Sequence, residues 1–175
     1  MAERNNLNTS EVDDIIWGTS SQSGKQGVDL GRMAALNAGY DVRSSGVTLD
    51  RFCGSGITTV NLAAAQIMSG MEDLVVAGGV EMMSYTRGEA PPSSLDAGNE
   101  ELRRRYPQLN VGIAADISAT EENVSRAELD AFSLESQKRA GRAVEEGAFS
   151  RALVPVNNPD GTLALDQEEY PRPQT

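Results

Sequence analysis

The stretch VTLDRFCGSGITTVNLAAAQIMSGMEDLVVAGG, residues 47–79, decides the fold class of this chain of 175 residues. It opens with a short apolar segment typical of a strand and passes through the tight turn Cys-Gly-Ser-Gly. An alanine-rich helix is expected over residues 57–69, with Gly70 placed to end it. The continuous apolar run at residues 74–77 is typical of a strand inside a covered parallel sheet. We therefore predict a strand–helix–strand unit over residues 46–79 and an α/β protein.

The sequence before this unit repeats the same alternation of signals. DIIWGT, residues 14–19, is short, apolar and rich in β-branched side chains, which predicts a buried strand. A polar loop with glycines follows over residues 20–27, and residues 28–38 carry apolar side chains on one helical face before Gly39. Together the two repeats predict half of a doubly wound sheet.

After residue 79 the composition changes, and a mainly helical region is expected. Residues 86–99 contain two prolines and small polar side chains, typical of a surface excursion. A long helix is expected over residues 126–146, because Ser125 and Glu128 have the spacing of a capping box. Three smaller features are expected after it: a helix stop at Gly147, an edge strand over residues 153–156 interrupted by Pro155, and a turn at residues 158–161.

Composition restricts the possible functions. The net charge of -11 argues against nucleic acid, which proteins bind largely through Lys and Arg. No stretch approaches the roughly 20 apolar residues of a membrane span, and the polar N-terminal segment lacks a signal-peptide core, so we expect a cytoplasmic protein. With 0 histidines, the chain holds no Ser-His-Asp or Cys-His pair and no histidine metal ligand.

Cys53, the single cysteine, is the main candidate for chemistry. It lies between a predicted strand and a predicted helix, where unpaired N–H groups and the helix dipole favour an anion. The same N–H groups could hold the oxyanion of an attacked thioester, and Gly54 and Gly56 would allow a sharp turn and leave space for a substrate. A lone cysteine also serves as a small buried apolar side chain, and the residues alone leave both interpretations open.

Four other signals are weaker. The loop from Gly18 to Lys25 resembles a phosphate-binding loop, but its spacer has five residues where that motif has four, and Gln26 replaces the magnesium-binding Ser or Thr. Gly54-Ser55-Gly56 begins like a dinucleotide fingerprint, but Thr59 replaces the third glycine. We interpret the basic run at residues 103–105 as a solvated face. The acidic group Asp166, Glu168 and Glu169 is interpreted as exposed tail.

The segment from Val47 to Tyr85 resembles the active-cysteine segment of the thiolases. In that family a strand leads to Cys-Gly-Ser-Gly, an alanine-rich helix follows, and a strand ends in Ala-Gly-Gly-x-Glu-x-Met-Ser, which here is AGGVEMMS at residues 77–84. Residues 10–18, 32–39, 125–140 and 147–156 are similar to further thiolase segments. The resemblance implies a partial thiolase-like layered αβα fold, with residues 1–84 in the N-terminal core domain and residues 85–175 in part of the loop domain that covers the active site.

The resemblance also implies the chemistry. Cys53 would attack a 3-ketoacyl-CoA or acetyl-CoA thioester and become acylated, with its backbone N–H in the oxyanion hole. Coenzyme A would be substrate and product, with no permanently bound cofactor and no metal. Asn110 and Val111 stand where the family has side chains that line the acyl end of the pocket. Asp50 stands where the family commonly has asparagine.

The family's histidine and second cysteine belong to its C-terminal half, so this chain alone would be catalytically incomplete. We expect a fragment, a split-gene product or a remnant that forms a homo-oligomer or pairs with a complementary C-terminal half. Two alternatives stay open at this point. One is a non-catalytic remnant that binds coenzyme A or a partner, and the other is a nucleotide-binding module that uses the loop at Gly24 and Lys25.

Overall fold

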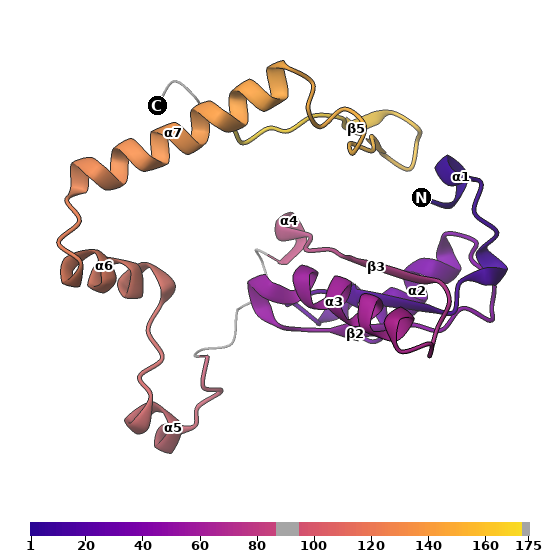
Figure 1. The fold of residues 1–175 in the computed structure, drawn as a ribbon, viewed down its shortest axis with the longest axis horizontal. Coiled ribbons are helices and arrows are strands. Elements are labelled where there is room, and N and C mark those ends of the chain that lie inside the picture. Colours follow the sequence, from indigo (N-terminus) through magenta and orange to yellow (C-terminus); the bar gives the residue numbers. More distant parts are fainter. Residues whose placement is uncertain (87–94, 173–175) are drawn as a thin grey trace. The chain divides into compact units, whose positions relative to one another are not determined.

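The computed structural model describes residues 1–86 and 95–172, which form two compact units, Met1–Ser93 and Ser94–Thr175 (Figure 1). The first unit contains three strands, four α-helices and three single turns of 3-10 helix among its described residues. Its strands are β1 (Asp14–Gly18), β2 (Val47–Leu49) and β3 (Val75–Gly79). Its helices are α1 (Ala2–Asn5), η1 (Thr9–Glu11), η2 (Gly24–Gln26), α2 (Leu30–Asn37), η3 (Phe52–Gly54), α3 (Ser55–Met68) and α4 (Met83–Thr86).

The three strands form a parallel sheet in the order β2-β1-β3, so the earliest strand lies in the middle. Ile16 of β1 is in register with Val47 on one side and Ala77 on the other, and it is 2 % exposed. β3 continues to Gly79, beyond the apolar run that predicted it. The strand is longer because Gly79 pairs with Gly18 of β1. The two glycines approach so closely that a β-carbon at Gly79 would lie 2.5 Å from the carbonyl oxygen of Gly18.

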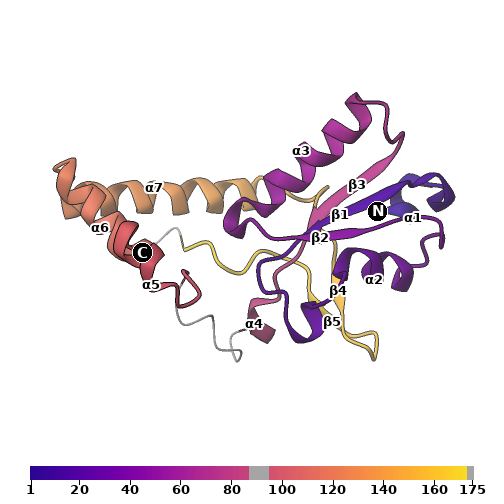
Figure 2. The same cartoon turned by 90° about the horizontal axis from the view of Figure 1, so that it is seen from below.

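The two longer helices of this unit cover opposite faces of the sheet (Figure 2). On the α2 face, Val12, Ile15 and Ala35 form the buried core, with Trp17 packed against it. On the α3 face, Gly18 lies so close to Ser55 that a β-carbon on the glycine would be 2.9 Å from the serine Cβ. This arrangement confirms the expected α/β fold with helix, sheet and helix in layers.

α2 begins two residues later than expected. Val28 has a φ of 61°, in the left-handed region, and Asp29 then caps the helix by accepting a hydrogen bond from the Arg32 amide at 3.2 Å. Thr48 of β2 donates its hydroxyl to the same Asp29 oxygen at 2.9 Å. The cap therefore also fastens the start of α2 to the sheet.

The second unit contains α5 (Glu100–Arg105), α6 (Val111–Glu121), α7 (Arg126–Glu145) and the antiparallel pair β4 (Val156–Asn157) and β5 (Leu163–Leu165). The predicted capping box at the start of α7 is present, and Gly147 follows the helix with a φ of 69°. The expected strand over residues 153–156 is wrong in its extent. Residues 147–153 form successive turns, with Leu153 donating to the carbonyl of Phe149, so β4 starts at Val156.

The predicted turn at residues 158–161 is confirmed, since the amide of Gly161 donates to the carbonyl of Asn158 at 2.9 Å. The turn joins β4 to β5, a strand that was not expected. The predicted excursion over residues 86–99 lies mostly outside the described residues. Among the described residues of this unit, Asp96 and Gly141 are the buried ones.

Candidate active site

The carboxyl ends of the three parallel strands lie at one edge of the sheet. The chain leaves this edge after Gly18, Leu49 and Gly79, and the loops after Gly18 and Leu49 contain the Gly24-Lys25 segment and Cys53. In open α/β sheets the ligand crevice lies outside this edge, where neighbouring connections diverge to opposite faces. The divergence here is between β1, which leads into α2, and β2, which leads into α3.

Cys53 lies at this edge, in the single helical turn that joins β2 to α3. Its thiol is free and exposed. α3 begins two residues later and runs for 14 residues, so its dipole favours negative charge close to the sulfur. The alternative that Cys53 is a small buried side chain is wrong, because the residue is exposed.

The sharp turn before Cys53 is made by Phe52 and not by the glycines after it. Phe52 has a φ of 48°, which is unusual for a residue with a bulky side chain, and that side chain is 62 % exposed. Gly54 has an ordinary φ of -87°. The expectation that Gly54 and Gly56 permit the turn is therefore corrected. Space beside them is present, since a β-carbon on Gly56 would have no heavy atom within 4 Å.

Two side chains hold this turn. Asp50 accepts a hydrogen bond from the amide of Phe52 at 2.7 Å, which gives a role to the residue that stands where the family commonly has asparagine. The Ser55 hydroxyl accepts from the amide of Arg51 at 2.8 Å and donates to the carbonyl of Phe52 at 2.7 Å. Ser55 is 6 % exposed, so its hydroxyl is fixed between the turn and the sheet.

A second polar cluster at the same edge is organised by Glu81, two residues after β3. One carboxylate oxygen of Glu81 accepts from the amides of Ser20 at 3.0 Å and Ser21 at 3.3 Å, and from the Thr19 hydroxyl at 3.3 Å. The other oxygen accepts from the side-chain amide of Gln26 at 2.9 Å. The buried Gln26 also accepts from the amide of Met82 at 2.7 Å.

The hydrogen bonds determine the charge state of Glu81. Burial raises the pKa of Glu81, but the hydrogen bonds from Gln26, Ser21 and Ser20 outweigh it and hold the pKa below its ordinary value. The ionised carboxylate thus ties the loop after β1 to the end of β3. No role for Glu81 followed from the sequence, although an acidic residue shortly after a predicted strand, at the sheet edge that carries Cys53, was a usable signal.

The same cluster argues against the nucleotide-binding alternative. A phosphate loop offers its backbone N–H groups to phosphate oxygens. Here the amides of Ser20 and Ser21 already donate to Glu81, and the amide of Lys25 donates to the Tyr85 hydroxyl at 3.1 Å. The Lys25 ammonium lies 5.8 Å from the centre of the Tyr85 ring.

The other predicted site residues lie in the second unit. Asn110 caps α6 by accepting from the amide of Gly112 at 3.0 Å, and Val111, the first residue of α6, is 82 % exposed. In the basic run, Arg103 pairs with the buried Asp96 and Arg105 with Glu101. All three arginines of the run are exposed, as expected of a solvated face.

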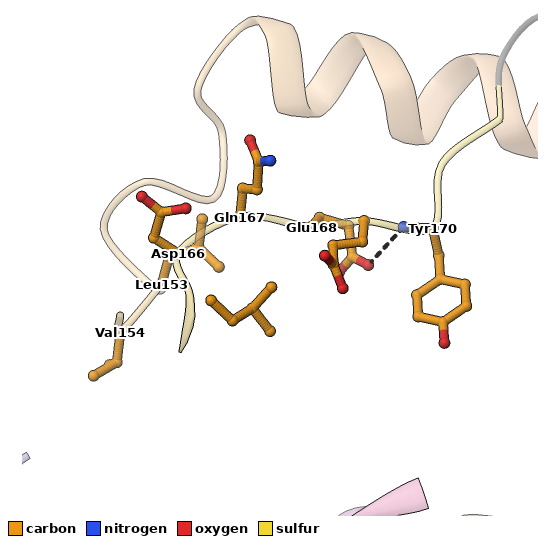
Figure 3. A pocket seen from close by; sticks show the side chains of 8 residues that line it. Leu153, Val154, Asp166, Gln167, Glu168 and Tyr170 are labelled. Carbon is orange, nitrogen blue, oxygen red and sulfur yellow. Dashed lines mark hydrogen bonds between the residues drawn. The ribbon is translucent and has the colours of Figure 1, made fainter. Parts of the chain in front are cut away.

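The acidic group near the C-terminus borders a hollow of about 160 Å³ (Figure 3). Leu153, Val154 and Leu165 supply its apolar wall, and Glu168 accepts from the amide of Tyr170 at 3.3 Å. Within residues 1–86 and 95–172, no group of three or more His, Cys, Asp or Glu side chains is arranged to hold a metal ion. Among the same residues, no helix is both long and apolar enough to span a membrane.

Fold and site together define a parallel α/β protein with an exposed cysteine at a strand-to-helix turn. The family model described as thiolase, N-terminal domain, matches residues 1–175. The chain therefore belongs to the thiolase family, as the AGGVEMMS segment indicated.

Similar curated proteins carry thiolase names. A 3-ketoacyl-CoA thiolase of Psychrobacter cryohalolentis is 36 % identical over 169 residues, covering 94 % of this chain and 42 % of that protein. A beta-ketoadipyl-CoA thiolase of Pseudomonas aeruginosa is 36 % identical over 194 residues, covering 100 % of this chain and 48 % of that protein. A 3-ketoacyl-CoA thiolase of Acinetobacter baumannii is 33 % identical, covering 99 % and 45 %. The chain thus spans a little under half the length of these relatives.

Proposed function

We propose that this chain supplies the nucleophile half of an acyl-CoA C-acyltransferase site, with Cys53 as the residue that is acylated. The observation that carries the proposal is the position of the single cysteine. In a chain that matches the thiolase N-terminal domain over its full length, Cys53 is exposed at the carboxyl edge of the sheet and at the start of α3.

In the proposed reaction, the sulfur of Cys53 forms a bond to the carbonyl carbon of an acyl-CoA thioester. The bond from that carbon to the coenzyme A sulfur then breaks, and the proton lost by Cys53 ends on the departing coenzyme A. The backbone N–H of Cys53, in the turn that precedes α3, would contribute to holding the oxyanion in between. The acyl group is afterwards passed on to a second coenzyme A thioester or to coenzyme A.

In the thiolase mechanism a histidine and a second cysteine carry the proton transfers, and the 175 residues contain 0 histidines and 1 cysteine. We propose that a complementary C-terminal half supplies them, either within an oligomer or on a second chain. In this proposal, residues 1–84 serve as part of the catalytic core domain and residues 85–175 as part of the loop domain. Asn110 and Val111 of the loop domain would line the acyl end of the substrate pocket. A cytoplasmic setting and the absence of a bound cofactor belong to the same proposal.

Intact-mass analysis after incubation with acetyl-CoA and acetoacetyl-CoA tests the assignment. The full chain, in the assembly in which it is purified, is expected to gain one acyl group, and Cys53→Ser is expected to gain none. Coenzyme A binding without acylation of Cys53, measured by calorimetry and by mass, would instead support the non-catalytic remnant. The non-catalytic remnant is the second candidate function. The absence of histidine and of a second cysteine from the 175 residues favours it.

A further inference from the structure

Of the two side chains that hold the turn at Cys53, Ser55 is buried and has no role in the proposed reaction. The Ser55 hydroxyl accepts from the amide of Arg51 at 2.8 Å and donates to the carbonyl of Phe52 at 2.7 Å, so it contacts the Asp50–Arg51 and Phe52–Cys53 peptide groups. Ser55 is buried, whereas Arg51, Phe52 and Cys53 are all exposed. Ser55 therefore anchors a turn whose other side chains face solvent.

The turn needs such an anchor because the backbone conformation at Phe52 is strained. A φ of 48° at Phe52 places a large side chain in the left-handed region, and conformations of this kind persist only where their surroundings enforce them. The exposed Phe52 ring gains little from packing. The backbone of the turn is held by the amides of Gly54 and Ser55, which donate to the carbonyls of Arg51 and Phe52. Side-chain hydrogen bonds of Asp50 and Ser55 add to these, and Ser55 is the buried one of the two side chains.

Ser55 is itself positioned by the central strand. Its Cβ lies against Gly18, where a β-carbon would be 2.9 Å away, and its backbone carbon would be 3.2 Å from that β-carbon. The start of α3 is thus seated on the last residue of β1. A displacement of Ser55 would move the turn and the sulfur together, and small misplacements of a reacting atom reduce reaction rates strongly.

We propose that Ser55 is a positioning residue, which holds the Phe52–Cys53 peptide in the orientation that presents the Cys53 sulfur at the start of α3. The inference rests on the proposed role of Cys53 as nucleophile. It concerns the geometry of the turn and does not require contact between Ser55 and a substrate.

The test measures how fast Cys53 reacts with iodoacetamide in the full chain, folded and in strong denaturant, by intact mass. Because the chain has 1 cysteine, the added mass reports Cys53 alone. Ser55→Ala is expected to slow the folded reaction on the order of tenfold, the factor that corresponds to the loss of a typical hydrogen bond, and to leave the denatured rate unchanged. Ser55→Thr, which keeps the hydroxyl, is expected to restore most of the rate.

Thr59→Val is the matched control. Thr59 is one turn further along the same buried face of α3, is 0 % exposed, and donates its hydroxyl to the carbonyl of Gly56 at 2.8 Å without contacting the turn. This variant is expected to lose similar stability and to keep the wild-type alkylation rate. Rates are compared for samples that have the wild-type emission of Trp17.

Three results would overturn the inference: an unchanged folded rate in Ser55→Ala, an equal loss in Thr59→Val, or a wild-type rate no higher than that of the denatured chain. Its failure is distinguishable from that of the proposed function. If Cys53 follows the alkylation pattern but is never acylated by acyl-CoA, the proposed function fails while the role of Ser55 stands. If Cys53 is acylated and Ser55→Ala has no effect on either reaction, the positioning role alone is wrong.

Discussion

The sheet unit and the helical unit of this chain differ in what stabilises them. In Met1–Ser93, Val12, Ile15 and Ile16 are each at most 3 % exposed, and parallel strands far apart in sequence hold the core together. In Ser94–Thr175, apolar side chains of α6 and α7 face solvent, such as Ile113 at 54 % and Phe132 at 79 %. Many of its stabilising contacts are local, such as the capping box at Ser125 and ion pairs one helical turn apart. A longer-range contact is the hydrogen bond from the amide of Arg172 to the side chain of Gln137 at 2.7 Å.

This difference indicates two kinds of sensitivity to mutation. A unit with a buried core loses most stability when a core side chain is shortened. A unit built of helices with exposed apolar faces depends on caps and on whatever covers those faces in the assembled protein. The chemistry of the candidate site is placed on the first kind of unit, where a rigid strand edge positions Cys53.

The largest expected effect is that of Ile16→Ala at the centre of the sheet. Ile16 is 2 % exposed and lies between two neighbouring strands, so its truncation should cost about 2–5 kcal/mol of unfolding free energy. The single tryptophan, Trp17, adjoins it in β1 and reports this transition by fluorescence in urea. Ile113→Ala, at 54 % exposure in α6, should change the free energy by at most about 0.5 kcal/mol. Equal losses in the two variants would remove the contrast between the units.

The next effect is that of Ser125→Ala, which removes the capping box of α7. The loss should be about 1 kcal/mol of helix stability, since the hydroxyl that accepts from the amide of Glu128 disappears, whereas the backbone amide of residue 125 can still donate to the Glu128 carboxylate. Carbon chemical shifts in the first turn of α7 would measure it, and the Trp17 transition should not move. Ser133→Ala is the control, because that hydroxyl donates only within the helix, to the carbonyl of Leu129. A shifted Trp17 transition in Ser125→Ala would show that the units are coupled.

Acidification should loosen the loop after β1, because its hydrogen bonds converge on the carboxylate of Glu81. The effect should be larger there than in the helices of the second unit. The pKa of Glu81 is held below the ordinary glutamate value of 4.5, so its stabilising contribution is complete above pH 4.5 and is lost as the pH falls through the folded pKa. The amides of Ser20 and Ser21 should then exchange several-fold faster with solvent. Glu81→Gln should show that faster exchange already at neutral pH, and protection that stays constant down to low pH would contradict the expectation.

The smallest effect separates charge from hydrogen bonding at Asp50. Asp50→Ala removes the acceptor for the Phe52 amide and should cost about 0.5 kcal/mol, the low end for an exposed hydrogen bond. Asp50→Asn keeps an acceptor oxygen and should leave both stability and the alkylation rate of Cys53 near wild type. A large loss in Asp50→Asn would mean that the negative charge itself, and not the hydrogen bond, sets the turn.

Much of the sheet unit could be predicted because its signals are local. DIIWGT and LVVA carry their own strand patterns, and the helix expected over residues 57–69 is α3 (Ser55–Met68). Gly70, two residues after this helix, has a φ of 74°. The capping box of α7 was equally readable from a spacing of three residues. In each case neighbours in sequence decide the structure.

The polar clusters of the site could not be predicted in the same way. Glu81 and Ser20 are 61 positions apart, and nothing in either segment alone shows that the two loops meet. The turn at Phe52 was assigned to the glycines because they adopt left-handed conformations without cost, whereas here a hydrogen-bonded phenylalanine adopts one. The second strand of the hairpin, β5, was missed because its three residues are exposed and show no alternation of burial.

The middle position of β1 has a consequence for how the chain acquires its structure during synthesis. β1 is made first, yet both of its neighbours come later, and the carbonyl of Leu74 that binds the amide of Asp13 lies 61 positions further on. Strand pairing over so long a separation forms slowly. Until it forms, Ile15, Ile16 and Trp17 lie in an exposed apolar segment whose backbone is unpaired and which is prone to aggregation. On the ribosome the nascent chain therefore passes through a window in which aggregation or capture by a chaperone competes with completion of the sheet.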